Sequence, residues 1–82
     1  MARARARVSG SFGDFTRSDW ELVIREAALG VEDTRIAELY LLDAVPQIEI
    51  GAELRIDRST VSRRLVRIID RIERTANKIK LV

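Results

Sequence analysis

Residues 58 to 67, RSTVSRRLVR, hold the side chains of this chain that are best suited to recognising another molecule. In a helix, the residues spaced three and four apart share one face. Arg58, Ser59, Ser62 and Arg63 therefore lie together near the start of such a helix. A guanidinium binds guanine through two hydrogen bonds, and a serine hydroxyl hydrogen-bonds to several base edges. We predict that these four residues contact bases in a major groove.

The segment around this helix has the pattern of two short helices joined by a tight turn, residues 46 to 67. Pro46 suits the first helical position, because its missing N–H is not needed there. Gly51 falls where the second helix crosses closely, and Arg55-Ile56 forms the turn. Asp57 is a suitable N-cap for the second helix, its carboxylate accepting from the N–H of Ser59 or Thr60. This pattern predicts a helix-turn-helix. The alternative is an ordinary helical hairpin with a solvated basic face.

The composition argues against an enzyme or a metalloprotein. The 82 residues include neither histidine nor cysteine, which removes the commonest general base and the commonest metal ligands. No acidic catalytic cluster and no pair of nucleophile and base is evident. We therefore expect no catalysis, no cofactor, no metal and no small-molecule ligand. The longest apolar run, LYLL, is too short to cross a membrane, and no signal peptide is recognisable, so a cytoplasmic location is expected.

The net charge of +2 conceals an uneven distribution. Residues 18 to 54 carry two Arg and nine acidic residues, whereas residues 55 to 82 carry seven Arg, two Lys and three acidic residues. Residues 1 to 17 are also basic. This clustering of basic residues is typical of a nucleic-acid-binding surface.

Residues 1 to 16 contain two glycines and little apolar periodicity, which predicts a flexible basic arm. Arg3, Arg5 and Arg7 alternate with alanine, so an extended arm can lay all three in a minor groove or along phosphates. The alternative is a solvated tail. Phe12 and Phe15 are expected to pin the end of the arm to the folded domain, residues 17 to 82.

The chain before the two-helix segment predicts two further helices. Ser18 with Glu21 matches a capping box, so a helix is expected from Asp19 to Leu29, ended by Gly30. Trp20 is expected in the core rather than as a base-stacking platform. A second helix opens at Glu32 and Asp33 and ends near Ala44, before Pro46. Its acidic face is expected to be solvated or, alternatively, to bind a basic partner; it comprises Glu32, Asp33, Glu38 and Asp43.

The last helix is predicted from Arg58 to about Ile79, with apolar residues alternating at spacings of four and three. Its extension, residues 68 to 80, outruns a three-helix core. We expect it to form a homodimer interface; the alternative is packing within the chain against Trp20 and Val23. The interface residues would be Ile69, Ile72, Ala76 and Ile79.

Residues 32 to about 72 resemble the helix-turn-helix of region 4 of bacterial sigma factors, and are similar to LuxR-type DNA-binding domains. The matching segments are EDTRIAELYLLDAV, IEIGAEL, the RID turn and RSTVSRRL. Two positions depart from these families, which usually have Gly at Arg55 and Ala at Gly51. No segment resembles the sigma domain that melts promoters, so a complete sigma factor is not expected. The resemblance implies that Arg58, Ser59, Ser62 and Arg63 approach bases. It implies backbone contacts by Gln47, Arg55, Thr60 and Arg67. Arg64 is assigned to neither group, since it lies between Val61 and Leu65 on the buried side and can pair with an acid.

The sequence as a whole predicts an all-α fold, a small three- to four-helix bundle with a helix-turn-helix and a long C-terminal helix. The predicted function is sequence-specific binding of double-stranded DNA by a homodimeric transcriptional regulator of bacterial, plasmid or phage origin. An alternative is a sigma-like adaptor that docks on RNA polymerase or another partner protein. A further alternative is the DNA-targeting part of a recombinase or transposase system.

Overall fold

The computed structural model describes residues 15 to 79, and in this part of the chain all regular structure is helical. The predicted arm residues Arg3, Arg5, Arg7 and Phe12 lie outside the described residues. The elements are α1 (Arg17–Glu26), α2 (Val31–Ala37), a π-helical turn η2 (Glu38–Leu42), α3 (Gln47–Leu54) and α4 (Arg58–Lys78). No helix between residues 15 and 79 is long and apolar enough to cross a membrane.

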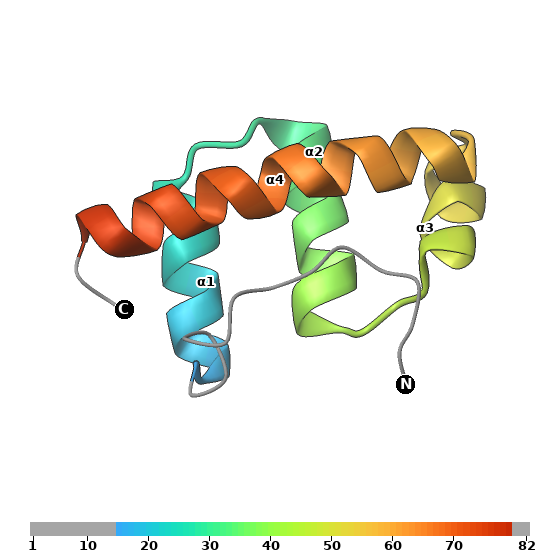
Figure 1. The fold of residues 1–82 in the computed structure, drawn as a ribbon. Helices are drawn as coiled ribbons and strands as arrows, with labels where there is room; N and C mark the ends of the chain where they lie inside the picture. Colours follow the sequence, from blue (N-terminus) through green and yellow to red (C-terminus); the bar gives the residue numbers. More distant parts are fainter. Residues whose placement is uncertain (1–14, 80–82) are drawn as a thin grey trace.

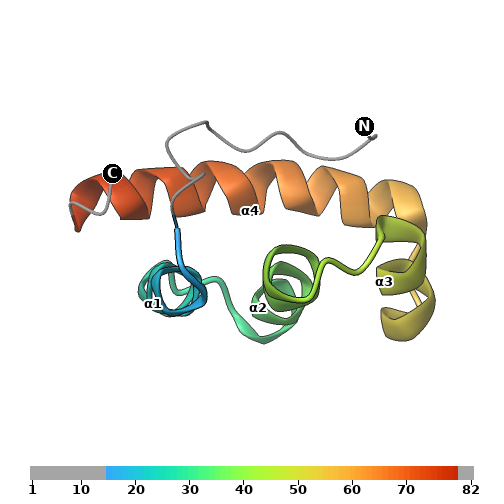
Figure 2. The ribbon, with the colours of Figure 1, turned by 90° about the horizontal axis from the view of Figure 1, so that it is seen from below.

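The fold is built on α4, which runs along one side of α1, α2 and α3 and contacts all three (Figures 1 and 2). Its buried stripe forms the centre of the core, because these side chains recur once per helical turn. Val61, Leu65 and Ile72 on this stripe are completely buried. The shorter helices contribute Val23, Ile36 and Ile50, which are also completely buried. The predicted all-α architecture is thereby confirmed.

The second half of α4 is covered by α1 of the same chain. Within the single chain Ile69 is 5% exposed, and Ile72 and Ala76 are 0% exposed. Arg71 adds a polar link, donating from Nε to the carbonyl of Ala27 at 2.9 Å. These three apolar side chains are therefore not available to form the predicted homodimer interface. Ile79 is half-buried and packs on the same core. The structure instead agrees with the alternative, in which the second half of α4 packs within its own chain.

The N-terminus of α1 lies two residues before the predicted one. Thr16, not Ser18, is the N-cap, and its hydroxyl accepts from the N–H of Asp19 at 3.1 Å. The Asp19 carboxylate accepts in return from the N–H of Thr16 at 3.0 Å. Phe15 packs on Trp20 edge to face, with ring centroids 5.0 Å apart. Phe15 and Trp20 flank this cap as a hydrophobic staple, so Thr16 gains apolar support that Ser18 lacks.

The connections on either side of α2 also differ from the prediction. Helix α1 ends at Glu26 instead of Leu29, and Ala28, directly after the C-cap Ala27, has a φ of +52°. Gly30 instead precedes α2 with a φ of +94°. The following helix ends in η2, where the N–H of Asp43 reaches back five residues to the carbonyl of Glu38. Extended backbone is required before a proline, so the helix cannot continue into α3.

The acidic side chains of the α2–η2 segment mostly bind arginines of other helices. Arg64 of α4 pairs with both Glu32 and Asp33, at 3.2 Å from Asp33. Arg17 at the start of α1 pairs with Asp43 at 3.2 Å and also donates to the carbonyl of Leu42. The acidic face predicted to be solvated remains exposed to solvent at Glu32 and Asp43, while its carboxylates also link neighbouring helices.

Candidate nucleic-acid interface

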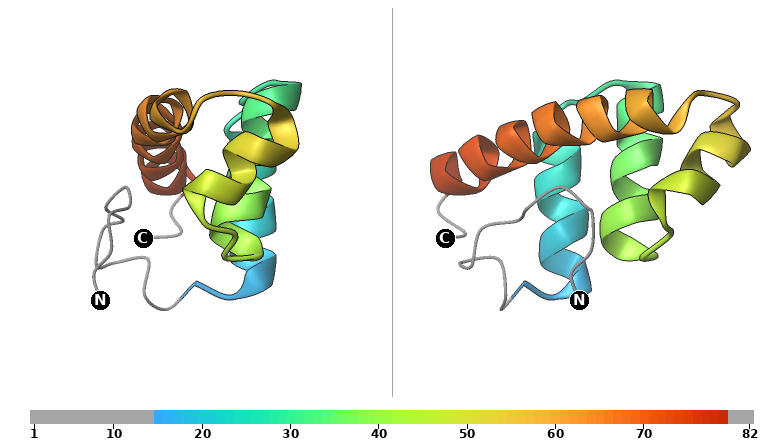
Figure 3. Two further views of the ribbon diagram at one scale, coloured as in Figure 1. Left: turned by 90° about the vertical axis from the view of Figure 1, so that its right-hand side faces the viewer. Right: turned by 45° about the vertical axis from the view of Figure 1, so that its right-hand side comes forward.

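Helices α3 and α4 and the three-residue turn between them form a helix-turn-helix at one end of the molecule (Figures 1 and 3). Pro46 is the N-cap of α3 rather than its first helical residue, and its carbonyl accepts from the N–H of Ile50 at 3.0 Å. The turn itself has Arg55 in the left-handed conformation, with φ of +61° and ψ of +43°. Ile56 follows and is half-buried against the core.

Gly51 sets how closely the turn approaches α3. It is buried, and a Cβ atom there would lie 2.7 Å from the carbonyl oxygen of Ile56 and 3.6 Å from the N of Arg58. Real Cβ atoms do not approach an oxygen this closely, so only glycine fits without a shift of the turn backbone. The predicted need for a small residue is confirmed, and the closest neighbour is the turn rather than the helix after it.

Asp57 caps α4 as predicted. Its carboxylate accepts from the backbone N–H of Ser59 at 2.9 Å and from the Ser59 hydroxyl. These hydrogen bonds from Ser59, together with the charges of Arg63 and Arg58, hold the pKa of the Asp57 carboxyl below its ordinary value. Because the Ser59 hydroxyl donates its proton to Asp57, its oxygen faces solvent chiefly as an acceptor.

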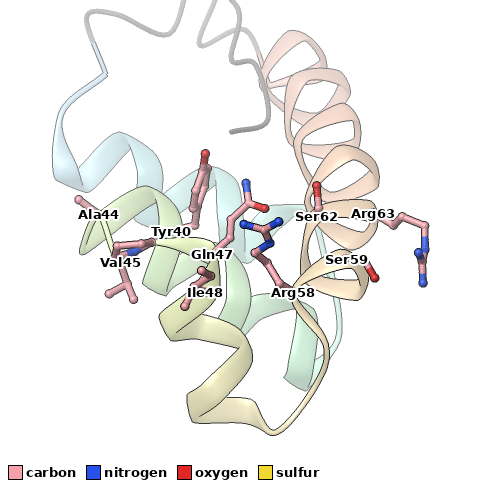
Figure 4. A pocket seen from close by; sticks show the side chains of 10 residues that line it. Tyr40, Ala44, Val45, Gln47, Ile48, Arg58, Ser59, Ser62 and Arg63 are labelled. Atoms are coloured by element: carbon pink, nitrogen blue, oxygen red, sulfur yellow. The ribbon is translucent and has the colours of Figure 1, made fainter. Parts of the chain in front are cut away.

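The first turns of α4 present the predicted base-contacting residues outward. Arg58, Ser59, Ser62 and Arg63 are all exposed. In Figure 4, Arg58 extends back toward Gln47 of α3, whereas Arg63 extends away from it. The two guanidinium groups therefore diverge, and together they span the end of the helix-turn-helix.

A surface groove of about 740 Å³ lies between the start of α3 and the start of α4 (Figure 4). Arg58, Ser59, Ser62 and Arg63 line one side, and Gln47 lines the other. The floor and far side include apolar residues that the sequence did not assign to the site: Tyr40, Ala44, Val45, Pro46 and Ile48. Ile48 is 61% exposed, because it lies outside the buried stripe of α3. An apolar residue outside that stripe was the sequence feature that could have indicated this part of the groove.

The residues predicted to contact the backbone occupy different positions around this surface. Gln47 is half-buried at the start of α3, and Arg55 and Arg67 are exposed. Thr60 is half-buried, and its hydroxyl oxygen accepts from Arg63 at 3.4 Å. Gln47, Arg55 and Thr60 thus belong to the same two-helix motif as the residues predicted to contact bases, and Arg67 follows one turn beyond Arg63 on α4.

Ion pairing divides the arginines of the C-terminal half into two groups. Arg64 pairs with two carboxylates of α2, Arg71 with a carbonyl of α1, and Arg74 with Asp70 at 3.1 Å. Among the described residues of this half, the arginines with neither an ion pair nor a hydrogen bond to another helix or its cap lie around the helix-turn-helix: Arg55, Arg58, Arg63 and Arg67. These four arginines outnumber Asp57, the one acidic residue between positions 55 and 67, so the surface keeps a surplus of positive charge, which favours an anionic partner.

The described residues include no group of acidic side chains placed to hold a metal ion. Comparisons of this chain with protein-family models, with curated proteins and with solved structures each found no match.

Proposed function

We propose that this chain is a sequence-specific double-stranded DNA-binding protein, a small transcriptional regulator of bacterial, plasmid or phage type. One observation carries the proposal: Arg55, Arg58, Arg63 and Arg67 of the helix-turn-helix are exposed and form no ion pair among the described residues. Farther along the fold, Arg64 and Arg74 are ion-paired and Arg71 is hydrogen-bonded to the Ala27 carbonyl. The helix α4 enters the major groove, and α3 lies across the phosphate backbone.

The side chains have distinct roles in this proposal. Arg58 and Arg63 pair with guanine edges, and Ser62 reads an adjacent base. The Ser59 hydroxyl donates its hydrogen bond to Asp57, so its oxygen is available to accept one from an amino group of adenine or cytosine. Gln47, Arg55, Thr60 and Arg67 hold the phosphates and set the register. The arm residues Arg3, Arg5 and Arg7 are proposed to follow the minor groove.

Homodimeric binding to two half-sites remains part of the proposal, but through a different surface from the predicted one. Ile69, Ile72 and Ala76 are already buried within the single chain. Two copies must therefore meet outside this stripe, or bind neighbouring half-sites independently.

The first experiment is selection of bound duplexes from a random DNA pool at two salt concentrations, followed by sequencing. A sequence-specific regulator enriches a motif, and its affinity falls steeply as salt rises, because bound arginines release counterions. A two-fold symmetric motif supports a dimer. Retention without an enriched motif contradicts sequence-specific reading, and no retention at low salt contradicts DNA binding altogether.

The adjacent arginines Arg63 and Arg64 provide a matched pair of variants. Arg63→Ala is expected to relax preference at one base pair of the enriched motif and to cost about 1–3 kcal/mol of binding free energy. Arg64→Ala removes the same charge from the neighbouring position, but this guanidinium is bound to Glu32 and Asp33. It should lower stability and leave base preference unchanged. Equal loss from both variants on every sequence, random DNA included, contradicts the base-reading role of Arg63.

An adaptor that docks on RNA polymerase is the second candidate. The exposed Ile48 in the groove favours it, because an exposed apolar side chain in a concave surface is typical of a protein contact. Capture of polymerase by the purified chain, with no binding to any isolated duplex, would support this candidate over the regulator.

A further inference from the structure

Val66 is an exposed apolar residue on the same face of α4 as the proposed base-contacting residues. Its side chain is 60% exposed, on a helix whose other valine, Val61, is completely buried. It lies four residues after Ser62 and three after Arg63, so these three side chains are neighbours on the helix surface. Val66 therefore contributes little to the core and belongs to the outward face.

The surroundings of Val66 indicate what kind of target it can contact. Its neighbours along this face are a hydroxyl at Ser62, guanidinium groups at Arg63 and Arg67, and a carboxylate at Asp70, all exposed. Among residues 15 to 79, the other large apolar residues that are exposed lie on other helices, Val31 on α2 and Ile48 on α3. This argues against a protein partner, since such interfaces have an apolar centre. The two methyl groups of Val66 form a small apolar spot within a polar, basic face. Such a face is complementary to a target that carries a small apolar group within a polar, anionic surface.

Duplex DNA offers such a group in the major groove, the 5-methyl of thymine, which lies beside the O4 acceptor. Ser59 and Val66 are seven residues apart, about 10 Å along the helix axis. This distance corresponds to about three base-pair steps. A helix seated in the groove at Ser59 can thus bring Val66 to a base about three steps away.

We propose that Val66 contacts a thymine methyl group and fixes the preference for thymine at one position of the site, about three base pairs from the base read by Ser59. This inference rests on the proposed DNA-binding function. It adds a specificity determinant of a different kind, because the contact is apolar and depends on one methyl group of the base rather than on a hydrogen bond.

The test replaces thymines by deoxyuridine, which lacks only that methyl group. In the duplex enriched by selection, each thymine is replaced in turn, and binding is measured for the wild type, Val66→Ala and Val31→Ala. Val31 is 92% exposed at the start of α2, so its variant controls for loss of an exposed valine. Alanine is tolerated at both exposed helical positions, and a thermal melt confirms folding.

The expected result is that deoxyuridine at one position weakens wild-type binding about fourfold, the effect of one buried methyl-sized group. Val66→Ala should bind the thymine duplex correspondingly less well and no longer distinguish thymine from deoxyuridine there, whereas Val31→Ala should behave as the wild type. The inference is overturned if the wild type binds selectively but no thymine is sensitive, or if Val66→Ala keeps the full sensitivity. Failure of the wild type to bind any duplex overturns the proposed function as well, so the two failures are distinguishable.

Discussion

Replacement of Arg55 by glycine should change stability and DNA affinity in opposite directions. Arg55 ends α3 with a φ of +61°, a region that costs a residue with a side chain about 1–2 kcal/mol and glycine almost nothing. Glycine gains freedom in the unfolded chain, which offsets about 0.5–1 kcal/mol of this relief. The guanidinium is exposed and forms no hydrogen bond or ion pair within residues 15 to 79, so its removal breaks no polar interaction there. Arg55→Gly should therefore raise the free energy of unfolding by up to about 1 kcal/mol.

The same substitution removes one of the four arginines without an ion pair at the helix-turn-helix. If Arg55 contacts a phosphate, binding weakens by a similar factor on every duplex, and the slope of log affinity against log salt falls by about one. Stability is measured by urea and thermal unfolding, where 1 kcal/mol corresponds to about 4–8 °C in a domain of this size. Affinity is measured by fluorescence anisotropy at several salt concentrations, on the selected duplex and on a scrambled one.

Two control variants separate the causes. Arg55→Ala removes the charge but keeps the strained φ, so it should weaken binding equally without raising stability. Arg25→Ala removes an exposed arginine from α1 and should leave the salt slope unchanged. A less stable Arg55→Gly would refute the strain argument. Unchanged affinity and salt slope in both Arg55 variants would refute the backbone contact.

Three further predictions concern the fold. Gly51→Ala should destabilise the fold by up to about 2 kcal/mol, because the close approach to the Ile56 carbonyl outweighs the gain of about 1 kcal/mol in helix propensity. A clear rise in the urea midpoint would show that the turn has room. Asp57→Ala should be less stable than the wild type. Since the folded-state pKa of Asp57 is lowered, the wild-type advantage is complete at neutral pH, shrinks as pH falls below the ordinary value of 3.8 and vanishes below the folded-state pKa. A difference in unfolding midpoint that does not change between pH 7 and pH 2 would contradict this role. Arg71→Ala should lose about 1 kcal/mol through its bond to the Ala27 carbonyl, measured by urea unfolding, and an unchanged midpoint would show that this link contributes nothing.

Local sequence signals predicted the helix-turn-helix closely. Asp57 is a cap whose partner, Ser59, is two residues away, so its role depends on neighbouring residues alone. The buried stripe of α4 follows from helical periodicity, which also leaves Ser62 and Arg63 on the outer face. For this reason the sequence was enough to predict the fold class, the bounds of α4 and the exposure of the proposed base-contacting residues. The start of α1 was not, because two overlapping capping patterns fit the sequence and only the packing of Phe15 on Trp20 distinguishes them.

The sequence by itself determined which residues of α4 are apolar and that they form one stripe, but not which surface covers them. Only the tertiary structure decided that Ile72 and Ala76 are buried with Val23 and Ile24 of α1 in one core within a single chain. It also decided which arginines are neutralised, since the partners of Arg64 are more than thirty residues away in sequence. The physical reason is the same in both cases. Periodicity and capping act over one or two helical turns, whereas the partner of a buried stripe or of a charge depends on how distant helices pack.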